Sequence, residues 1–402
     1  MTDASVTVPV AGGPRLANPP DALELRHLRA FICVAEELNF SRAADRLFVS
    51  QPALSRQIRA LERLIGCDLL RRSTHQVELT PGGEALLEPA RQLMRDLAAA
   101  VGAARSASGE LAAALHKQWG TITDLTAADA ALRELRGAYE TLHAQFALPQ
   151  GLTVLPVNAN GVACLRLAPE TEPPATVVYL HGGCYSAGSA FGYRHLAGAL
   201  AVAADRSVLV PEYRLAPEHA FPAAVEDAVR SYLWLLDQDI PPSAVTIVGD
   251  SSGAHLALSL LLVARREDLP LPGRLVLFSP WLDMSCPYPD PEPGDPQPVV
   301  TPERARRFAA SYLAGHPADD PVVSPLTADL SGLPLMLIQA GTGDPLLQEA
   351  RWLAERARAH GAEVRLDLYP VDTHVFHTFW TLLPEAADAL RVAGRFTAGR
   401  SA

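Results

Sequence analysis

The sequence has few cysteines and no long apolar run among its 402 residues. No run approaches the roughly 20 apolar residues that a helix needs to span a bilayer, so we expect no membrane-spanning helix. The first 20 residues lack a charged start followed by an apolar core, which predicts a disordered tail over residues 1–22 rather than a secretory signal. The scattered cysteines show no zinc-like or redox spacing, so we expect no metal site and reduced thiols in a cytoplasm. They are Cys33, Cys67, Cys164, Cys184 and Cys286.

The net charge of -11 is distributed unevenly along the chain. From Arg26 to Arg72 nine arginines stand against five acidic residues, a local charge of +4. From Ser106 to the end of the chain 21 basic residues stand against 33 acidic ones, a local charge of -12. This excludes a chain that binds nucleic acid over its whole surface, and it predicts two domains with different partners.

The stretch from Leu25 to Val101 has the periodicity of several helices. Ser41 is a plausible N-cap for a short second helix, and Ser50, with Pro52 in the first turn, is a plausible N-cap for a third. A short hairpin or wing follows, and then a longer helix. The third helix should bury one apolar stripe, which consists of Leu54, Ile58, Leu61 and Ile65.

The second and third of these helices form a helix-turn-helix, whose second helix can enter the major groove of DNA. Arginine and glutamine on its exposed face are suited to contacts with base edges and phosphates. Spacing alone leaves DNA binding and a mere packing module with a solvated basic face about equally plausible. The candidate DNA-contacting residues are Gln51, Pro52, Ser55, Arg56 and Arg59.

The residues themselves favour DNA binding. Leu25–Phe31, Asn39–Ala44, Val49–Glu62, Leu69–Arg72 and Leu79–Gly83 closely resemble the LysR-type winged helix-turn-helix. The resemblance implies that residues 23–82 bind double-stranded DNA. It also implies that a helix over residues 83–105 joins two heads, so that the chain is a homodimer or homotetramer. Family members usually continue into a two-lobed effector domain, and the sequence has no such domain.

Beyond a linker at residues 106–119, residues 120–402 alternate between short apolar runs and helical patterns. Near-continuous apolar runs are typical of strands buried on both faces. The alternation predicts a doubly wound, mostly parallel α/β sheet. The expected strands are Leu152–Val157, Val162–Leu167, Thr176–His181, Ser207–Pro211, Val245–Gly249, Leu275–Ser279, Leu335–Ala340 and Val364–Tyr369.

The segment Gly249–Gly253 fits the G-x-S-x-G pattern, with Ser251 at its centre. It lies between an apolar run and a helical stretch, which is the context that a nucleophile elbow requires. Asp344 and His374 each follow a later expected strand and complete the chain order of a hydrolase triad. The triad needs all three, because an imidazole must take the proton of the serine and a carboxylate must orient the imidazole. His377 is a rival base, although a surface histidine at a helix start is the simpler interpretation.

Adjacent glycines follow the expected strand that ends near His181. Their small size lets backbone N–H groups approach an acyl oxygen. We expect the N–H groups of Gly182, Gly183 and Ser252 to form an oxyanion hole, with His181 and Asp250 as structural supports.

Together these segments resemble the hormone-sensitive-lipase-like carboxylesterases over about residues 120–398. The motifs are His181–Gly183, Pro211–His219, Gly249–Gly253, Ser279–Asp283, Asp344–Leu346 and His374–Phe376. The resemblance implies an α/β-hydrolase that cleaves short- to medium-chain acyl esters or lactones without a cofactor. It also implies a cap, expected over residues 127–146 and 283–324. The usual third glycine of the oxyanion loop is Cys184, which could be sensitive to oxidation if exposed.

Three functions are compatible with this combination. The chain is a regulator that senses a small ester or lactone, with or without destroying it, an esterase with an uncoupled DNA-binding head, or a non-catalytic receptor on a hydrolase fold. A complete triad disfavours the receptor, because a receptor needs only binding.

Overall fold

The computed structural model describes residues 23–47, 49–72, 77–107, 122, 132–170, 175–287 and 301–399. The chain divides into two compact units, Met1–Ala100 and Val101–Ala402, and each is described by itself. The expected tail at residues 1–22, most of the expected linker and part of each expected cap segment lie outside the described residues. None of the helices described is both long enough and apolar enough to cross a bilayer.

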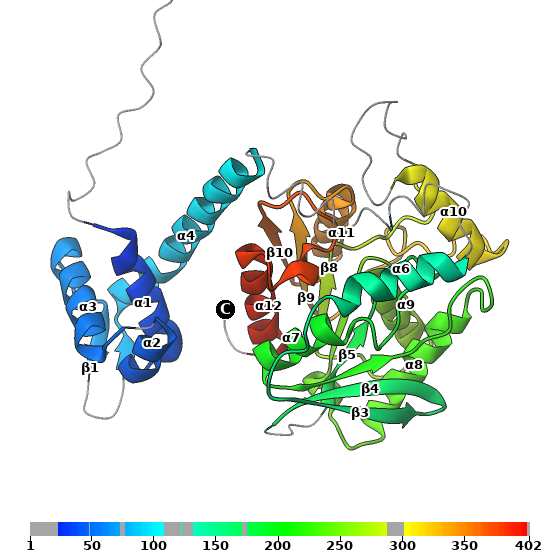
Figure 1. Cartoon of the computed structure of the whole chain (residues 1–402), viewed down its shortest axis with the longest axis horizontal. Helices are drawn as coiled ribbons and strands as arrows, with labels where there is room; N and C mark the ends of the chain where they lie inside the picture. Colours follow the sequence, from blue (N-terminus) through cyan, green and yellow to red (C-terminus); the bar gives the residue numbers. More distant parts are fainter. Residues whose placement is uncertain are drawn as a thin grey trace, which may run out of the picture. The chain divides into compact units, whose positions relative to one another are not determined.

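The first unit contains three short helices, a hairpin and the start of a long helix (Figure 1). The elements are α1 (Leu25–Glu37), α2 (Phe40–Arg46), α3 (Gln51–Ile65), β1 (Leu70–Arg72), β2 (Val77–Leu79) and α4 (Pro81–Ala107). The strands β1 and β2 pair antiparallel, which confirms the expected wing. Leu54, Ile58 and Leu61 of α3 are fully buried against the other helices.

Two details of the first unit differ from the expectations. Asn39 caps α2, because its side-chain oxygen accepts the backbone N–H groups of Ser41 and Arg42 at 2.9 and 3.0 Å. The helix therefore begins at Phe40, and Ser41 lies inside it rather than at its cap. Ile65 is 38% exposed, because it is the last residue of α3, immediately before the left-handed Gly66 that ends the helix.

The second unit is built on an eight-stranded sheet with the order β10-β9-β8-β7-β5-β6-β4-β3 (Figure 1). The strands β5 to β10 pair parallel where they are neighbours, whereas β3–β4 and β4–β6 pair antiparallel. All eight expected strands are present, with small shifts at their ends. They are β3 (Leu152–Ala159), β4 (Val162–Pro169), β5 (Ala175–Leu180), β6 (Ser207–Pro211), β7 (Thr246–Asp250), β8 (Arg274–Phe278), β9 (Leu335–Gly341) and β10 (Val364–Tyr369).

Helices cover both faces of this sheet. Alternate residues of β5 show the arrangement, since Val177 and Tyr179 pack with α7 and α12, whereas Val178 and Leu180 pack with α8, α9 and α11. The helices of the second unit, including α6 and α10 of the expected cap, are α6 (Leu132–Ala144), α7 (Arg194–Ala204), α8 (Ala223–Leu236), α9 (Ser252–Arg266), α10 (Pro302–Leu313), α11 (Leu347–Ala359) and α12 (Pro384–Thr397). A doubly wound sheet is thus confirmed, and its parallel strands end at one edge, where the functional side chains gather.

Helix α12 is not predicted by the hydrophobic pattern of the sequence. Its buried stripe contains Ala386, Ala389, Leu390 and Ala393, and Pro384 occupies its first turn. The spacing is that of an amphipathic helix, but three of these four residues are alanines. A stripe of alanines gives only a weak hydrophobic signal. Alanine is a good helix former, so it is common on exposed helix faces as well as on buried ones.

Candidate functional site

Ser251 lies in a sharp turn between β7 and α9, with φ 52° and ψ -120°. Two glycines make the turn possible. A Cβ on Gly249 would lie 2.2 Å from the carbonyl oxygen of Gly253, and a Cβ on Gly253 would lie 2.0 Å from the carbonyl oxygen of Leu180. Any side chain at either position would therefore collide with backbone, and the turn holds the serine hydroxyl clear of the sheet.

The structure brings Ser251 together with His374 and Asp344, as the sequence predicts. The Nε2 atom of His374 lies 2.9 Å from the Oγ atom of Ser251. Its Nδ1 atom lies 3.0 and 3.2 Å from the two carboxylate oxygens of Asp344. All three residues are less than 7% exposed. A carboxylate only accepts hydrogen bonds, so Nδ1 carries the proton and Nε2 is free to accept the proton of the serine.

Asp344 is held as a carboxylate in spite of its burial. Burial alone would raise the pKa of Asp344, but the neighbouring His374 and hydrogen bonds from Ser279 and the N–H of Leu346 lower the pKa below its ordinary value. The ionised form is the one that fixes the tautomer of His374 and stabilises an imidazolium.

His377, the rival base, is not on the surface, and neither of its ring nitrogens is hydrogen-bonded to Ser251. Its ring centroid lies 4.0 Å from those of both Phe278 and Phe376, and its Nε2 atom lies 3.2 Å from the Oε1 atom of Gln339. Burial lowers the pKa of His377 to about 3. The interpretation as a surface histidine is therefore wrong, because the chain after His374 folds back against β8 and β9 and carries His377 into the core.

The glycines after β5 are only partly arranged as expected. The backbone N–H of Gly182 donates to Oδ1 of Asp250 at 3.0 Å, so it is already paired with a buried carboxylate. This contact corrects the expected set of oxyanion donors. The structure pairs none of the N–H groups of Gly183, Cys184 and Ser252 with an acceptor among the described residues.

His181 and Asp250 contact the loop that carries these glycines. The ring of His181 stacks on Tyr213 with centroids 4.3 Å apart, and the Tyr213 hydroxyl donates to the carbonyl oxygen of His181 at 2.6 Å. Burial raises the pKa of Asp250 to about 7, although the Tyr179 hydroxyl and the Gly182 N–H oppose this shift by donating to the carboxylate. Both residues therefore contact the loop that carries the glycines and not the nucleophile itself.

Cys184 is buried, and burial raises the pKa of its thiol to about 12. The condition for easy oxidation, an exposed thiolate, is therefore not met at this position.

Both described parts of the expected cap contact the same loop. From α6, the Nε atom of Arg136 donates to the carbonyl oxygen of Ser186 at 2.8 Å, and its two terminal nitrogens each lie 2.8 Å from the carboxylate of Glu218. From α10, the ring of Tyr312 stacks on that of Tyr185 with centroids 3.7 Å apart. The two segments thus lie against the glycine-containing loop from different elements.

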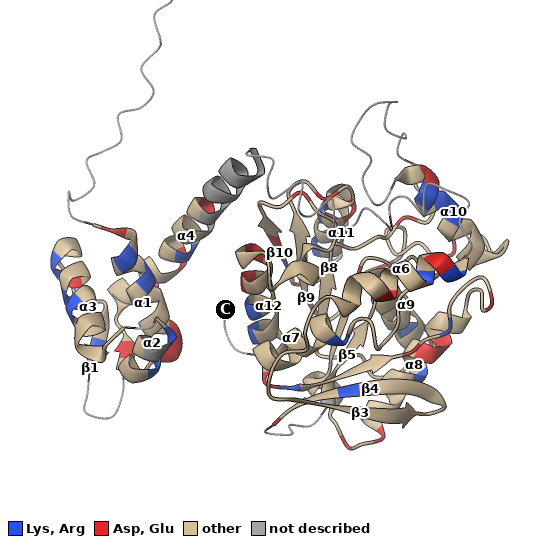
Figure 2. Cartoon of the chain, in the orientation of Figure 1, with Lys and Arg blue, Asp and Glu red and all other residues tan. Residues whose placement is uncertain are grey.

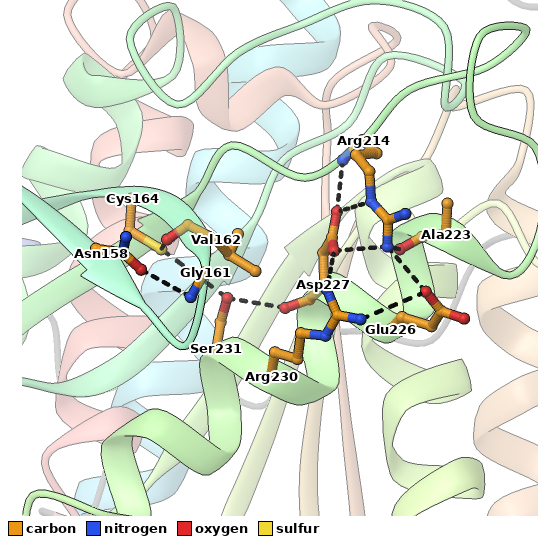
Figure 3. A network of polar contacts seen from close by, with 10 residues as sticks. All are labelled: Asn158, Gly161, Val162, Cys164, Arg214, Ala223, Glu226, Asp227, Arg230 and Ser231. Atoms are coloured by element: carbon orange, nitrogen blue, oxygen red, sulfur yellow. Dashed lines mark hydrogen bonds and ion pairs between the residues drawn. The ribbon is translucent and has the colours of Figure 1, made fainter.

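Arg214 and Asp227, which the sequence analysis did not single out, hold the segment after β6 in place (Figure 3). The backbone N–H and the Nε atom of Arg214 donate to one carboxylate oxygen of Asp227, at 3.0 and 2.8 Å. Its Nη2 atom reaches the other oxygen at 2.8 Å and Glu226 at 2.9 Å. Asp227 is almost fully buried, so this pair fixes the start of the segment that carries Glu218.

In the first unit, the candidate DNA-contacting residues share one face of α3. Gln51, Pro52, Arg56 and Arg59 are exposed and Ser55 is half-buried, on the side away from the buried stripe of the helix. Figure 2 shows the positions of basic residues coloured along the ribbon of this helix. Guanidinium groups on an exposed helix face can donate in pairs to phosphates or to guanine edges.

Comparison with known proteins gives two matches along the chain. Residues 177–378 match the family described as having the alpha/beta hydrolase fold. Residues 25–84 match the bacterial regulatory helix-turn-helix proteins of the lysR family.

Individual relatives resemble the second unit. An acetyl-hydrolase of Streptomyces hygroscopicus is 42% identical over 229 residues, which are 57% of this chain and 77% of that protein. A putative acetyl-hydrolase, LipR, of Mycobacterium tuberculosis is 34% identical over 255 residues, 63% of this chain and 83% of that protein. The solved structure of an esterase from the bacterial hormone-sensitive lipase family superposes with a TM-score of 0.64 at 35% identity, covering 71% of this chain and 97% of that one.

A group of buried histidines, formed by His143 of α6, His195 of α7 and His181, makes the stability of the second unit dependent on pH. The ring of His143 lies 4.2 Å from that of Tyr193 and 5.2 Å from that of His195. The pKa of His143 lies well below its ordinary value of 6.5. Burial is the largest cause, and the nearby His195 and His181 lower the pKa further. Burial also lowers the pKa of His181 and of His195 to about 4. The native state therefore keeps these rings neutral where the unfolded chain takes up protons.

We expect the free energy of unfolding to fall as the pH is lowered from 6.5 towards 4, by at most about 1.4 kcal/mol per pH unit for each histidine. Tryptophan fluorescence during urea unfolding measures this, because every tryptophan follows residue 118. His143→Phe should flatten the dependence, whereas the exposed control His219→Gln should keep it. An unchanged slope in His143→Phe would contradict the role of that ring.

Proposed function

Since the chain belongs to the α/β-hydrolase fold family and carries the helix-turn-helix of the bacterial lysR regulators in front of it, we propose that it is a transcriptional regulator whose effector domain is a serine carboxylesterase. The substrates are short- to medium-chain acyl esters or lactones. The observation that carries the proposal is the hydrogen-bonded series from Ser251 through His374 to Asp344. Acetyl-hydrolases and esterases among the relatives support a small acyl group.

In this proposal Ser251 is the nucleophile. Its Oγ atom attacks the acyl carbonyl while Nε2 of His374 takes its proton, and the imidazolium that forms is stabilised by Asp344. The imidazolium then gives the proton to the leaving alcohol, which leaves the acyl group on Ser251. Water, deprotonated by His374, releases the acid and restores the serine. The 2.9 Å separation between Oγ and Nε2 supports the first proton transfer without rearrangement.

The negative oxygen of the tetrahedral intermediate needs donors on the side away from His374. We assign these to the backbone N–H groups of Gly183, Cys184 and Ser252, because Gly182 is already bound to Asp250. Ser252 is the first residue of α9, so its N–H also lies at the positive end of a 15-residue helix. The replacement of a glycine by Cys184 leaves the backbone donor in place.

The first unit provides the second half of the function. Its α3 enters the major groove of double-stranded DNA, with Gln51, Pro52, Ser55, Arg56 and Arg59 facing the duplex. The protein acts in the cytoplasm as a homodimer or homotetramer, because two heads read the two halves of a symmetric site. The exposure of these side chains on one face of α3 supports this assignment.

We expect the protein to hydrolyse aryl acetates and butyrates. Ser251→Ala should lose at least about 10⁴-fold in kcat, because the three residues of the triad act as a unit. His374→Ala should be similarly damaged. The control His377→Gln should keep most of its kcat although it loses stability, since His377 contacts Gln339 and not Ser251. The rate at which the aryl alcohol is released gives kcat for the wild type and for the three variants. A Ser251→Ala protein with near-normal turnover would refute the assigned nucleophile.

Binding to an operator fragment should weaken steeply with salt, since phosphate contacts release counterions. Arg56→Ala and Gln51→Ala should each lower specific affinity by about 1–3 kcal/mol if the side chain reads a base edge. The matched control is Arg351→Ala, which removes an exposed arginine from α11 of the second unit. Fluorescence anisotropy at several salt concentrations distinguishes the variants. Equal affinities for all three would mean that α3 does not read the groove.

Ligand and DNA binding should be coupled, because α4, which ends at Ala107, is followed in the described chain by α6, which begins at Leu132 and contacts the oxyanion loop. A phosphonate bound to Ser251 should change operator affinity by roughly 5- to 150-fold, and DNA should change ligand affinity by the same factor. Ser251→Ala mixed with phosphonate is the control, since it cannot be modified. Identical operator affinities for free and phosphonylated protein would identify an esterase with an uncoupled head.

A further inference from the structure

The loop that carries the proposed oxyanion donors has an unfavourable backbone conformation. Gly183, Cys184 and Tyr185 follow one another with φ values of 121°, 54° and 59°. Positive φ is easy for glycine but costly for residues with a Cβ atom, such as Cys184 and Tyr185. Conformations of this kind persist at functional sites only where surrounding contacts enforce them. The loop therefore needs an anchor, and the contacts of Tyr185 supply it.

Tyr185 is almost completely buried and makes three specific contacts. Its hydroxyl oxygen lies 2.6 Å from Nδ1 of His255. Its ring is stacked on that of Tyr312, with planes 8° apart. Its carbonyl oxygen accepts the backbone N–H of Ala216 at 2.8 Å. The side chain is thus held at both its ring and its hydroxyl, and the backbone immediately after Cys184 is held with it.

The protonation of His255 fixes the direction of this hydrogen bond. The Nε2 atom of His255 lies 2.6 Å from the carbonyl oxygen of Val323, which can only accept, so Nε2 carries a proton. Burial lowers the pKa of His255 to about 4, so the ring is neutral at pH 7 and Nδ1 is an acceptor. Ser259 does not compete for Nδ1, because its hydroxyl donates to the carbonyl oxygen of Val322 at 2.7 Å. The hydroxyl of Tyr185 is therefore the donor.

His255 belongs to α9, four residues after Ser251. The hydrogen bond from Tyr185 consequently joins the loop of Gly183 and Cys184 to the helix that begins at the nucleophile. An oxyanion donor is effective only if it lies within a few tenths of an ångström of its correct position relative to the attacking oxygen. Among the contacts that hold this loop, this buried hydrogen bond is the one that joins it to the helix of the nucleophile.

We propose that Tyr185 and His255 are positioning residues, which hold the oxyanion donors at their working distance from Ser251. This inference rests on the proposed esterase function. It predicts that loss of either residue weakens stabilisation of the tetrahedral intermediate. Binding of the ester should change little, because the carbonyl oxygen of the ester carries less charge.

The test compares two Tyr→Phe variants of the full chain. Tyr185→Phe keeps the stacked ring and removes only the hydroxyl. Tyr232→Phe is the matched control, because Tyr232 is also buried and its hydroxyl also donates one hydrogen bond, to the carbonyl oxygen of Pro270 at 2.7 Å. Tyr185→Phe should lose about tenfold in kcat with KM within about twofold of the wild type. Tyr232→Phe should keep the wild-type kcat even where its thermal stability falls.

A reversible trifluoromethyl ketone provides a second readout, since its addition to Ser251 creates an oxyanion in the same place. Its affinity should fall in Tyr185→Phe by about the same factor as kcat. If Tyr185→Phe does not accumulate as folded protein, substitutions of His255, the acceptor, test the same hydrogen bond. His255→Gln keeps an acceptor and a donor, and His255→Met keeps neither, so the Gln variant should have the higher kcat.

Equal kcat values for Tyr185→Phe and Tyr232→Phe would overturn the inference, as would equal kcat values for the two His255 variants. The wild-type protein in the same assay separates this result from failure of the proposed function. If the wild type hydrolyses esters and the variants match it, only the positioning role is refuted. If the wild type hydrolyses no ester, the esterase proposal fails and the positioning role fails with it.

Discussion

The close approach of the turn after β7 to the end of β5 is the constraint on which the site depends. Gly253 packs so tightly against the carbonyl oxygen of Leu180 that no side chain fits between them. This packing places Ser251 beside the loop that begins at His181, so the proposed nucleophile and the proposed backbone donors share one edge of the sheet. The parallel strands β9 and β10 then end at the same edge and deliver Asp344 and His374. The chemistry is thus a consequence of strand direction and of two glycines.

Two buried carboxylates near this edge, those of Asp344 and Asp250, have pKa values that are shifted in opposite directions. This difference separates their roles. Burial penalises the charge of both. At Asp344 the neighbouring His374 and several hydrogen bonds overcome the penalty, so its pKa is lowered, whereas at Asp250 desolvation dominates and raises the pKa to about 7. A carboxylate that stays ionised can orient an imidazole through a catalytic cycle. Asp250 instead accepts the backbone N–H of Gly182 and the hydroxyl of Tyr179, so it holds the loop that carries the glycines.

The strands and the hydrogen-bonded Ser251, His374 and Asp344 could be predicted from sequence, because apolar runs and the order of motifs are local signals. What could not be predicted depends on partners distant in the chain. The N–H of Gly182 is paired with Asp250, 68 residues later, and His377 is buried by Phe278, far earlier in the sequence. Local patterns identify which residues are present at an edge, but only packing decides which way a backbone donor or an imidazole faces.

The proposed fusion has a physical consequence for regulation, because its sensor consumes its ligand. In a binding protein, occupancy depends on the ligand concentration and the dissociation constant alone. In a serine hydrolase, it also depends on how fast the acyl group leaves Ser251, so the duration of any signal follows the deacylation rate. In the proposed mechanism, the contacts that place the oxyanion donors and orient His374 therefore set both turnover and the time during which the liganded state exists. A substitution that slows deacylation without weakening binding would lengthen the signal, so selection on regulation and selection on catalysis act on the same few hydrogen bonds.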